Sequence, residues 1–321
     1  MRVVMTGGGG FIGSYVLARM LGAGLAVTLV GPHTGKSLYT AALVAAGEVR
    51  FVRCDVTFQR EELLRDAIAD ADALVLLGYV MPTSTTKSAR LFEEYTSNVE
   101  PVMRLLRVAG DRPRHVVFSS SVSVYGAPAR VPVRESDAPS PLTPYGDAKL
   151  ACEHAITTLA TASGGTAAIL RYSTVYGPGE LVPRPIPNFI RSALAGEMPA
   201  IRGDGLDEHD YVHVTDVAEA TLGAIRLTAT GVYNIGTGVG TTTLDVARLV
   251  YRLASAKVSP TFGFARESQA RPIRVICDVE AARAELGFRA RRSLEGGICE
   301  EIGWFRSGLA AASRSVTKRV A

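Results

Sequence analysis

The stretch "RVVMTGGGGFIGSYV" at residues 2–16 decides the fold. It begins with an apolar, β-branched run, continues through a glycine turn and ends in apolar residues at helical spacing. Gly7, Gly10 and Gly13 form a GxxGxxG pattern between the expected strand and helix. Glycines let the backbone approach a pyrophosphate closely, and the free amides of a helix N-terminus attract that anion. The stretch therefore predicts a dinucleotide-binding unit, in preference to a glycine turn without a ligand.

Similar strand and helix candidates alternate through the first half of the chain. Apolar strand-like runs lie at 25–30, 49–55, 73–77, 115–120 and 166–173, and helices are expected at 58–70, 87–109 and 145–162. This alternation predicts right-handed βαβ units and a parallel sheet covered on both faces. We therefore expect an α/β, Rossmann-type doubly wound domain over residues 1–175.

The second half has a different texture. "YGPGELVPRPIPNF" at 176–189 is rich in proline and glycine, and a helix-like stretch follows at 187–196. Such a stretch predicts a smaller C-terminal, substrate-binding domain over 176–321. The strand-like runs "DYVHV" (210–214) and "GVYNIG" (231–236) lead us to expect that 207–238 returns to the first sheet.

Composition and charge exclude several classes of protein. A chain of 321 residues that is 47% hydrophobic can bury a large core. Four widely separated cysteines without a CxxC pair predict neither a disulfide framework nor a metal site. A net charge of +4 with dispersed arginines argues against a nucleic-acid partner. The sequence shows neither a signal peptide nor an apolar run of membrane-spanning length, so we expect a cytoplasmic protein without a membrane partner.

Two hydroxyl-rich stretches carry the candidate chemistry. "PYGDAK" at 144–149 places Tyr145 and Lys149 at i and i+4, on one face of a helix. A phenol is a weak base at neutral pH, but a fixed ammonium favours its ionised form, so Tyr145 is a candidate general base for a sugar or alcohol hydroxyl. Ser121, in "SSSVSVYG" (119–126), could hydrogen-bond the same substrate oxygen; the alternative is a serine that caps a turn.

The choice between NAD and NADP depends on the end of the second expected strand. Dinucleotide folds often place an acid there to hold the adenosine ribose, but this chain has Gly31. His33 or Lys36 could then face a 2′-phosphate, which leaves NADP as an alternative to NAD. Asp55, at the end of the third strand, could accept a hydrogen bond from the adenine amino group; the alternative is a solvated turn aspartate.

The ordered motifs resemble the extended short-chain dehydrogenase/reductase family, the NAD-dependent sugar-nucleotide epimerases and dehydratases. The resemblance extends from "VVMTGGGGFIGSYV" to "SLEGGICEEIGWF" and includes "LRYSTVYGPG", "GDGLDEHDYVHVTDVAEA" and "YNIGTG". It implies an enzyme that binds NAD and a nucleotide sugar, with Ser121, Tyr145 and Lys149 as its catalytic residues. It also implies a homodimer that pairs through the helices at 87–109 and 145–162.

The same resemblance implies two sets of binding residues. The cofactor set is Gly7, Gly10, Phe11, Ile12, Gly13, Asp55, Val56, Leu77, Tyr145 and Lys149. The substrate set is Tyr79, Ser123, Thr174, Asn188, Gly203, Asp204, His209 and Arg271. The guanidinium of Arg271 suits a pyrophosphate, because its planar fork matches phosphate oxygens.

One departure from the family pattern narrows the reaction. The 4,6-dehydratases of the family carry an Asp–Glu pair where this chain has Val122 and Ser123, which disfavours that activity. We expect transient oxidation at C4 of a UDP-hexose or UDP-N-acetylhexosamine, followed by 4-epimerisation or by 5,6-dehydration. The second outcome would resemble the UDP-N-acetylglucosamine 5,6-dehydratases of tunicamycin-type antibiotic pathways. The sequence assigns no additional acid or base.

Two further alternatives stay open at this point. The first is an NADPH-dependent 4-ketoreductase of an NDP-deoxysugar, which would use the same three catalytic residues and is favoured by Gly31. The second is a non-catalytic nucleotide-binding sensor, against which the intact Ser121, Tyr145 and Lys149 argue.

Overall fold

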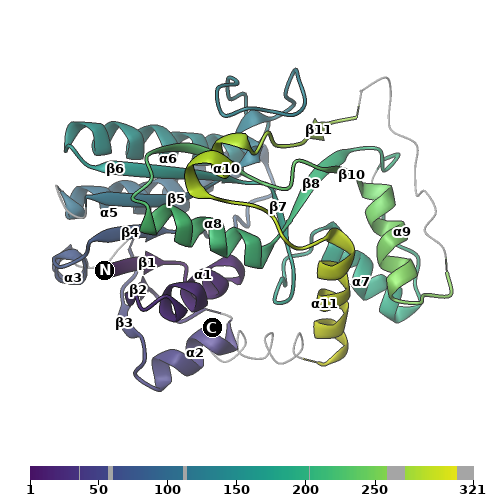
Figure 1. Cartoon of the computed structure of the whole chain (residues 1–321), viewed down its shortest axis with the longest axis horizontal. Coiled ribbons are helices and arrows are strands. Elements are labelled where there is room, and N and C mark those ends of the chain that lie inside the picture. The colour runs from purple at the N-terminus through teal and green to yellow at the C-terminus, as the bar shows by residue number, and fades with distance from the viewer. Residues whose placement is uncertain (36, 57–60, 111–113, 202, 259–271, 309–321) are drawn as a thin grey trace.

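A seven-stranded parallel sheet forms the centre of the computed structural model, which describes residues 1–35, 37–56, 61–110, 114–201, 203–258 and 272–308 (Figure 1). The strand order is β3-β2-β1-β4-β5-β6-β9. The strands are β1 (Arg2–Thr6), β2 (Ala26–Gly31), β3 (Arg50–Arg53), β4 (Ala73–Leu76), β5 (His115–Ser121), β6 (Thr166–Tyr172) and β9 (Gly231–Ile235). The order runs outward from β1 and then reverses at β4, which confirms the doubly wound, Rossmann-type fold. Such a reversal places the ligand site at the carboxyl ends of β1 and β4.

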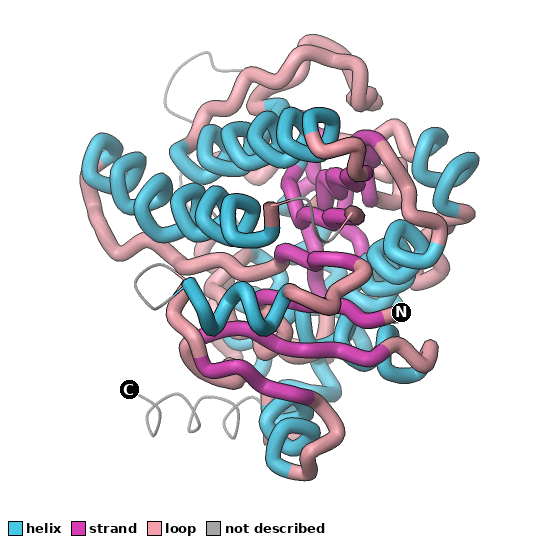
Figure 2. Tube along the Cα trace, turned by 90° about the vertical axis from the view of Figure 1, so that its left-hand side faces the viewer, coloured by secondary structure: helices cyan, strands magenta, loops and turns pink. Residues whose placement is uncertain are grey.

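Helices cover both faces of this sheet, as Figures 1 and 2 show. One face packs against α1 (Phe11–Gly22), α2 (Leu38–Ala45) and α8 (Val214–Arg226), and the other against α3 (Glu61–Ile68), α5 (Glu100–Ala109) and α6 (Pro144–Ala162). Alternate residues of each strand serve the two cores: Val3 and Met5 face the first, and Val4 faces the second. This alternation explains why the strands read as continuous apolar runs.

The helix expected over 87–109 is interrupted. It consists of α4 (Lys87–Glu94), a π-helical segment η1 (Tyr95–Val99) and α5. Pro101 has no N–H to donate to the carbonyl of Ser97, four residues earlier, and its ring crowds that carbonyl. A wider π turn just before the proline relieves this conflict.

A second layer contains β7 (Thr174–Tyr176), β8 (Glu208–His213), β10 (Gly240–Thr242) and β11 (Arg274–Val275), with β8 paired to the other three strands. Around them lie α7 (Pro185–Ala195), α9 (Thr243–Leu253) and α11 (Leu294–Arg306), and α10 (Glu280–Leu286) follows β11. Of the two strands expected to return to the first sheet, only 231–236 does so, as β9. The expectation was wrong for 210–214, because residues 210–213 form most of β8 in the second layer and Val214 begins α8.

The chain therefore passes between the layers several times. It enters the second layer at β7, returns through α8 and β9, and crosses again at β10. The domain limits of 1–175 and 176–321 stay a prediction. Among the described residues, no helix combines the length and the apolar character that crossing a membrane would need.

Candidate active site

The glycine turn between β1 and α1 is packed so tightly that side chains cannot replace its hydrogens. A Cβ on Gly13 would lie 2.0 Å from the carbonyl oxygen of Gly7, and a Cβ on Gly7, where φ is +75°, would lie 2.6 Å from the Gly78 amide nitrogen. Gly10 begins α1 without a side-chain cap on the first-turn amides. Those free amides, which include Phe11 and Ile12, form a cradle that suits the pyrophosphate of a dinucleotide.

The loop after β2 closes over the same turn. A Cβ on Gly9 would lie 1.6 Å from the Thr34 carbonyl oxygen, and the Ser37 amide donates to the Gly9 carbonyl at 3.1 Å. Gly31 itself is not crowded, because an added Cβ would meet only the His33 carbonyl at 3.5 Å. The missing ribose-binding acid is thus not forced by packing. His33 is exposed, and Lys36 lies outside the described residues.

The remaining cofactor candidates lie at the ends of neighbouring strands. Asp55 and Val56 follow β3 and are half-buried, and the Val56 carbonyl accepts a hydrogen bond from Arg104 at 3.0 Å. Leu77 follows β4 and packs against the first core. The carboxyl ends of β1, β3 and β4 thus lie on one edge of the sheet, where a bound dinucleotide would extend.

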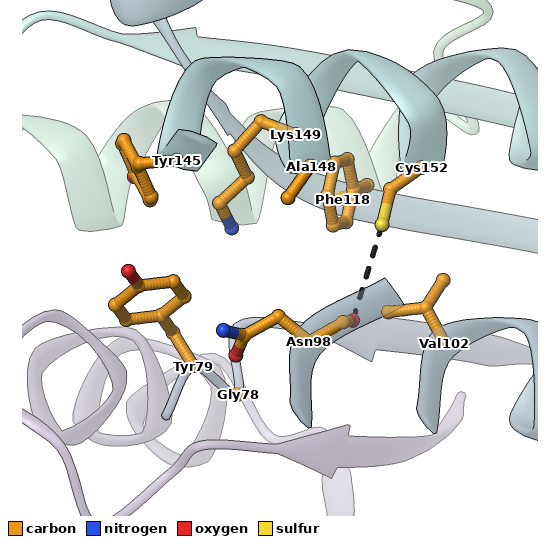
Figure 3. A pocket seen from close by; sticks show the side chains of 9 residues that line it. All are labelled: Gly78, Tyr79, Asn98, Val102, Phe118, Tyr145, Ala148, Lys149 and Cys152. Atoms are coloured by element: carbon orange, nitrogen blue, oxygen red, sulfur yellow. Dashed lines mark hydrogen bonds between the residues drawn. The ribbon is translucent and has the colours of Figure 1, made fainter. Parts of the chain in front are cut away.

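Tyr145 and Lys149 project from α6 into one pocket, as the sequence predicts (Figure 3). Only 6% of Lys149 is exposed; its Nζ donates to the Ser119 carbonyl at 2.7 Å and lies 5.8 Å from the centroid of the Tyr145 ring. This contact with β5 fixes the ammonium beside the phenol. The structure thus brings the Tyr145 ring and the Lys149 ammonium to one pocket.

Ser121 lies at the end of β5 and begins η2 (Val122–Tyr125), a 3₁₀ turn. Its hydroxyl accepts from the Ser123 amide at 3.2 Å and donates to the Ser123 Oγ at 3.1 Å. The turn-capping interpretation is therefore observed, and a catalytic role for Ser121 stays a prediction. The start of α6 presses against this turn, because a Cβ on Gly146 would lie 2.6 Å from the Ser123 carbonyl.

A carboxylate on α4 that the sequence left unassigned lies behind Tyr79, which lines the pocket. Tyr79 donates a 2.7 Å hydrogen bond to Glu94, and Asn98 donates one of 2.8 Å to its second oxygen. Glu94 is 1% exposed. Burial, together with the hydrogen bond and charge of Glu94, raises the pKa of Tyr79. The ring of Tyr79 meets Tyr145 edge-on, with centroids 5.1 Å apart.

The sequence holds only a weak signal for this group. Glu94 and Asn98 are four residues apart, one helical turn, after the fourth strand. Asn98 also holds the loop that carries Tyr79, because it exchanges hydrogen bonds of 2.7 and 2.9 Å with the Val80 backbone. Tyr79 and Glu94 come into contact because that loop folds back onto the helix.

A buried ion pair locks α6 to the sheet beneath the pocket. Arg171 of β6 binds Glu153 of α6 through two hydrogen bonds, of 3.0 and 2.6 Å, and donates to the Tyr125 hydroxyl at 2.9 Å. Tyr125 in turn donates to Asn234 of β9 at 2.8 Å, and Ser120 of β5 donates to Glu153. These contacts fix α6, and therefore Tyr145 and Lys149, against three strands.

The predicted substrate residues fall into two groups: two lie near the predicted catalytic residues, and the other described ones lie in the second layer. Tyr79 lies with Tyr145 and Lys149, and Ser123 lies with Ser121. The others belong to the second layer: Thr174 on β7, Asn188 on α7, Gly203 and Asp204 before β8, and His209 on β8. Arg271 lies outside the described residues. Burial lowers the pKa of His209, which favours a neutral ring at pH 7.

Asn188 and Asp204 already have protein partners. Arg191 donates to the Asn188 Oδ1 at 2.8 Å, and the Leu206 amide donates to an Asp204 carboxylate oxygen at 3.0 Å. The structure leaves a substrate-binding role for these second-layer residues as a prediction.

A doubly wound sheet, an uncapped helix behind a glycine turn, and a Tyr–Lys pair at the same sheet edge define a dinucleotide-dependent enzyme of the α/β class. The model of the NAD dependent epimerase/dehydratase family matches residues 3–236. This chain therefore belongs to that family, and its cofactor is NAD.

Individual relatives agree over nearly the whole length. The UDP-glucose 4-epimerase of Azospirillum brasilense is 32% identical over 95% of this chain and 92% of its own. The dTDP-glucose 4,6-dehydratase of Streptomyces niveus is 28% identical over 97% and 94%. The structure of MoeE5 in complex with UDP-glucose and NAD is 31% identical, with a TM-score of 0.81 over 96% of this chain and 100% of its own.

Proposed function

We propose that this enzyme is a UDP-N-acetylglucosamine 5,6-dehydratase that works through transient oxidation at C4. The observation that carries the proposal is the Tyr79–Glu94 pair beside Tyr145. It supplies a proton-transfer group at a site where Val122 and Ser123 replace the acid–base pair expected of a 4,6-dehydratase. The MoeE5 complex with UDP-glucose and NAD supports a UDP-sugar as the substrate class.

The three predicted catalytic residues act first. NAD, held by the glycine turn, would supply the hydride acceptor for C4 and the donor that returns the hydride. Tyr145 acts as a phenolate, whose negative charge the Lys149 ammonium stabilises, and becomes a neutral phenol when it removes the O4 proton. Ser121 turns its hydroxyl from Ser123 to the O4 oxygen. A positioned base of this kind contributes roughly 10²–10⁴-fold to the rate.

Dehydration follows from the ketone. A carbonyl at C4 acidifies the C5 proton, so that this proton and the C6 hydroxyl can leave together as water, with a C5=C6 double bond as the product. Val122 has no ionisable group, and the Ser123 hydroxyl accepts from Ser121. The elimination would therefore need a group from another element, and the Tyr79–Glu94 pair is the candidate.

A 4-epimerase is the second candidate, favoured by the 32% identical UDP-glucose 4-epimerase. Epimerisation needs only the hydride-transfer residues and a sugar that turns between two poses. It gives no role to a buried carboxylate behind Tyr79.

Proton NMR in heavy water separates the candidates. We expect UDP-N-acetylglucosamine, incubated with the NAD-loaded enzyme, to yield exocyclic alkene signals and to lose its C5 proton signal. Inversion at C4 without alkene or C5 exchange, with this substrate or with UDP-glucose, would instead establish the epimerase. Absence of any conversion contradicts both candidates, and dinucleotide that must be supplied as NADPH each turnover would indicate the ketoreductase.

We also propose that the enzyme acts as a cytoplasmic homodimer. The cysteines Cys54, Cys152, Cys277 and Cys299 are all free thiols, as a reducing compartment favours. The helices α4, α5 and α6, which pack together on one face of the sheet, carry exposed apolar side chains, among them Phe92 and Met103. Such a surface suits an isologous helix-to-helix interface.

A further inference from the structure

Tyr79 and Tyr145 enter the same pocket from opposite walls. Figure 3 shows Tyr145 and Lys149 on α6, facing Tyr79 and Asn98 across the pocket. The two tyrosine rings meet edge-on at 5.1 Å, and Lys149 Nζ lies 5.6 Å from the centroid of the Tyr79 ring. A sugar whose C4 hydroxyl reaches Tyr145 would therefore bring its neighbouring carbons toward the second phenol.

The two phenols differ in what stands behind them. Both rings lie near the Lys149 ammonium, and Tyr79 in addition donates a 2.7 Å hydrogen bond to the carboxylate of Glu94. A buried carboxylate is costly unless hydrogen bonds satisfy it, and Tyr79 and Asn98 do so here. The Tyr79 hydroxyl is thus hydrogen-bonded to a proton acceptor.

We propose that Tyr79 is the acid–base catalyst of the C5–C6 elimination and that Glu94 is a positioning residue that accepts and returns the Tyr79 proton; this rests on the proposed 5,6-dehydration. The raised pKa of Tyr79 keeps the phenol protonated between turnovers. It therefore transfers a proton by relay and does not compete with Tyr145 as the base for O4.

The proton and electron count closes in two stages. First, the C5 proton passes to the Tyr79 oxygen while the Tyr79 proton moves to Glu94, and the C–H electron pair forms the enolate of the C4 ketone. Tyr145, protonated since the C4 oxidation, donates a hydrogen bond to that enolate. Then the C6–O bond breaks, the electron pair forms C5=C6, and the leaving hydroxyl takes the proton from Tyr79 to become water. Glu94 returns its proton to Tyr79, so both residues end as they began.

The test measures oxidation and elimination separately in the NAD-loaded enzyme. With UDP-N-acetylglucosamine in heavy water, the absorbance of reduced nicotinamide reports C4 oxidation, and NMR reports C5 exchange and alkene formation. We expect Tyr79→Phe to oxidise C4 within about threefold of the wild-type rate but to lose alkene formation and C5 exchange by at least ~100-fold.

Two more variants complete the design. Glu94→Gln should lower the kcat of alkene formation by at least ~10-fold, leave KM within about threefold and leave C4 oxidation intact; Glu94→Asp should recover part of that loss. Tyr95→Phe, which changes an exposed tyrosine next to Glu94, is the matched control and should behave as wild type. Thermal unfolding of each variant checks the fold.

The outcomes are distinct. If the wild-type enzyme and Tyr79→Phe form the alkene at the same rate, the proposed role of Tyr79 is overturned. The proposed 5,6-dehydratase activity is then still supported. C4 oxidation that falls in step with alkene formation also overturns it, because Tyr79 would then only shape the pocket. If the wild-type enzyme forms no alkene, the proposed function fails.

Discussion

Two buried carboxyl groups outside the active site, those of Glu180 and Glu301, should make the free energy of unfolding depend on pH. Glu180, which follows β7, and Glu301 on α11 are each at most 1% exposed. Burial raises the pKa of Glu180 from 4.5 to about 7 against the opposing charges of Arg184 and Arg191. Burial and the charge of Glu180 raise the pKa of Glu301 well above its ordinary range. The native state thus holds protons on these groups that the unfolded chain releases at lower pH.

The sign of the resulting pH dependence follows from linkage. The stabilising, protonated form is fully present below about pH 4.5 and is lost as the pH rises through about 7. Glu180→Gln should therefore raise the free energy of unfolding by ~1–3 kcal/mol at about pH 8 and change it little at about pH 4. Urea unfolding at both pH values measures the difference. Glu295→Gln, on the exposed side of α11, is the control, and an equal effect of Glu180→Gln at both pH values would contradict this account.

The sequence reveals some of the site residues and conceals others, for a physical reason. Tyr145 and Lys149 are visible because both stand on one helix, where spacing alone fixes their relation. Tyr79 and Glu94 come from a loop and a helix, and hydrogen bonds such as those of Asn98 to Val80 set their distance. Contacts of that kind depend on tertiary folding and leave no periodic trace in the chain.

At the scale of elements, α1 shows how close packing dictates glycine. Gly13 and Gly22 both belong to this helix, but a Cβ on Gly13 would meet the Gly7 carbonyl, whereas a Cβ on Gly22 would meet nothing within 4 Å. Backbone cannot move aside as a flexible side chain can. We therefore expect that Gly22 tolerates a side chain and that Gly13 does not.

Alanine at each position tests that difference. Gly13→Ala should lower the free energy of unfolding by at least ~2 kcal/mol and weaken NAD binding, because the turn must open. Gly22→Ala should raise the free energy of unfolding by ~0.5–1 kcal/mol and leave NAD affinity unchanged. Urea titration and calorimetric NAD binding provide both values. Similar stability and NAD affinity for the two variants would show that the glycine turn is less confined than its geometry indicates.

Most elements of the first sheet could be predicted, and the exceptions are instructive. Buried parallel strands are apolar on both faces, so 73–77 and 115–120 stand out directly in the sequence. The break between α4 and α5 was hidden, because a π turn preserves the apolar spacing well enough to resemble one helix. The location of 210–214 in the second layer could not be inferred, since strand-forming residues do not specify which sheet they join.

At the scale of the whole molecule, the proposed homodimer predicts which exposed side chains lie between the two subunits. Phe92 on α4 is 73% exposed and is accompanied by the exposed Leu91, Tyr95 and Met103. Phe92→Glu should convert a dimer into a monomer, because a charge would be buried without a partner at the interface. Light scattering measures the mass. Leu227→Glu, after α8 on the opposite face of the sheet, should leave the dimer intact, and a monomeric wild-type protein would refute the prediction.

The contacts of Arg171 affect how inactive variants of this enzyme should be interpreted. Its guanidinium joins α6 to β6, and through Tyr125 to β9, with protein groups as partners throughout. Removing one member of a buried ion pair lowers the free energy of unfolding by about 3–5 kcal/mol, because the other charge is left uncompensated. A screen that measures only product formation would find variants of Arg171 as inactive as variants of Tyr145. The two defects differ in reversibility: cooler growth or a stabilising solute can restore a molecule that folds poorly, but neither can supply a base that is missing.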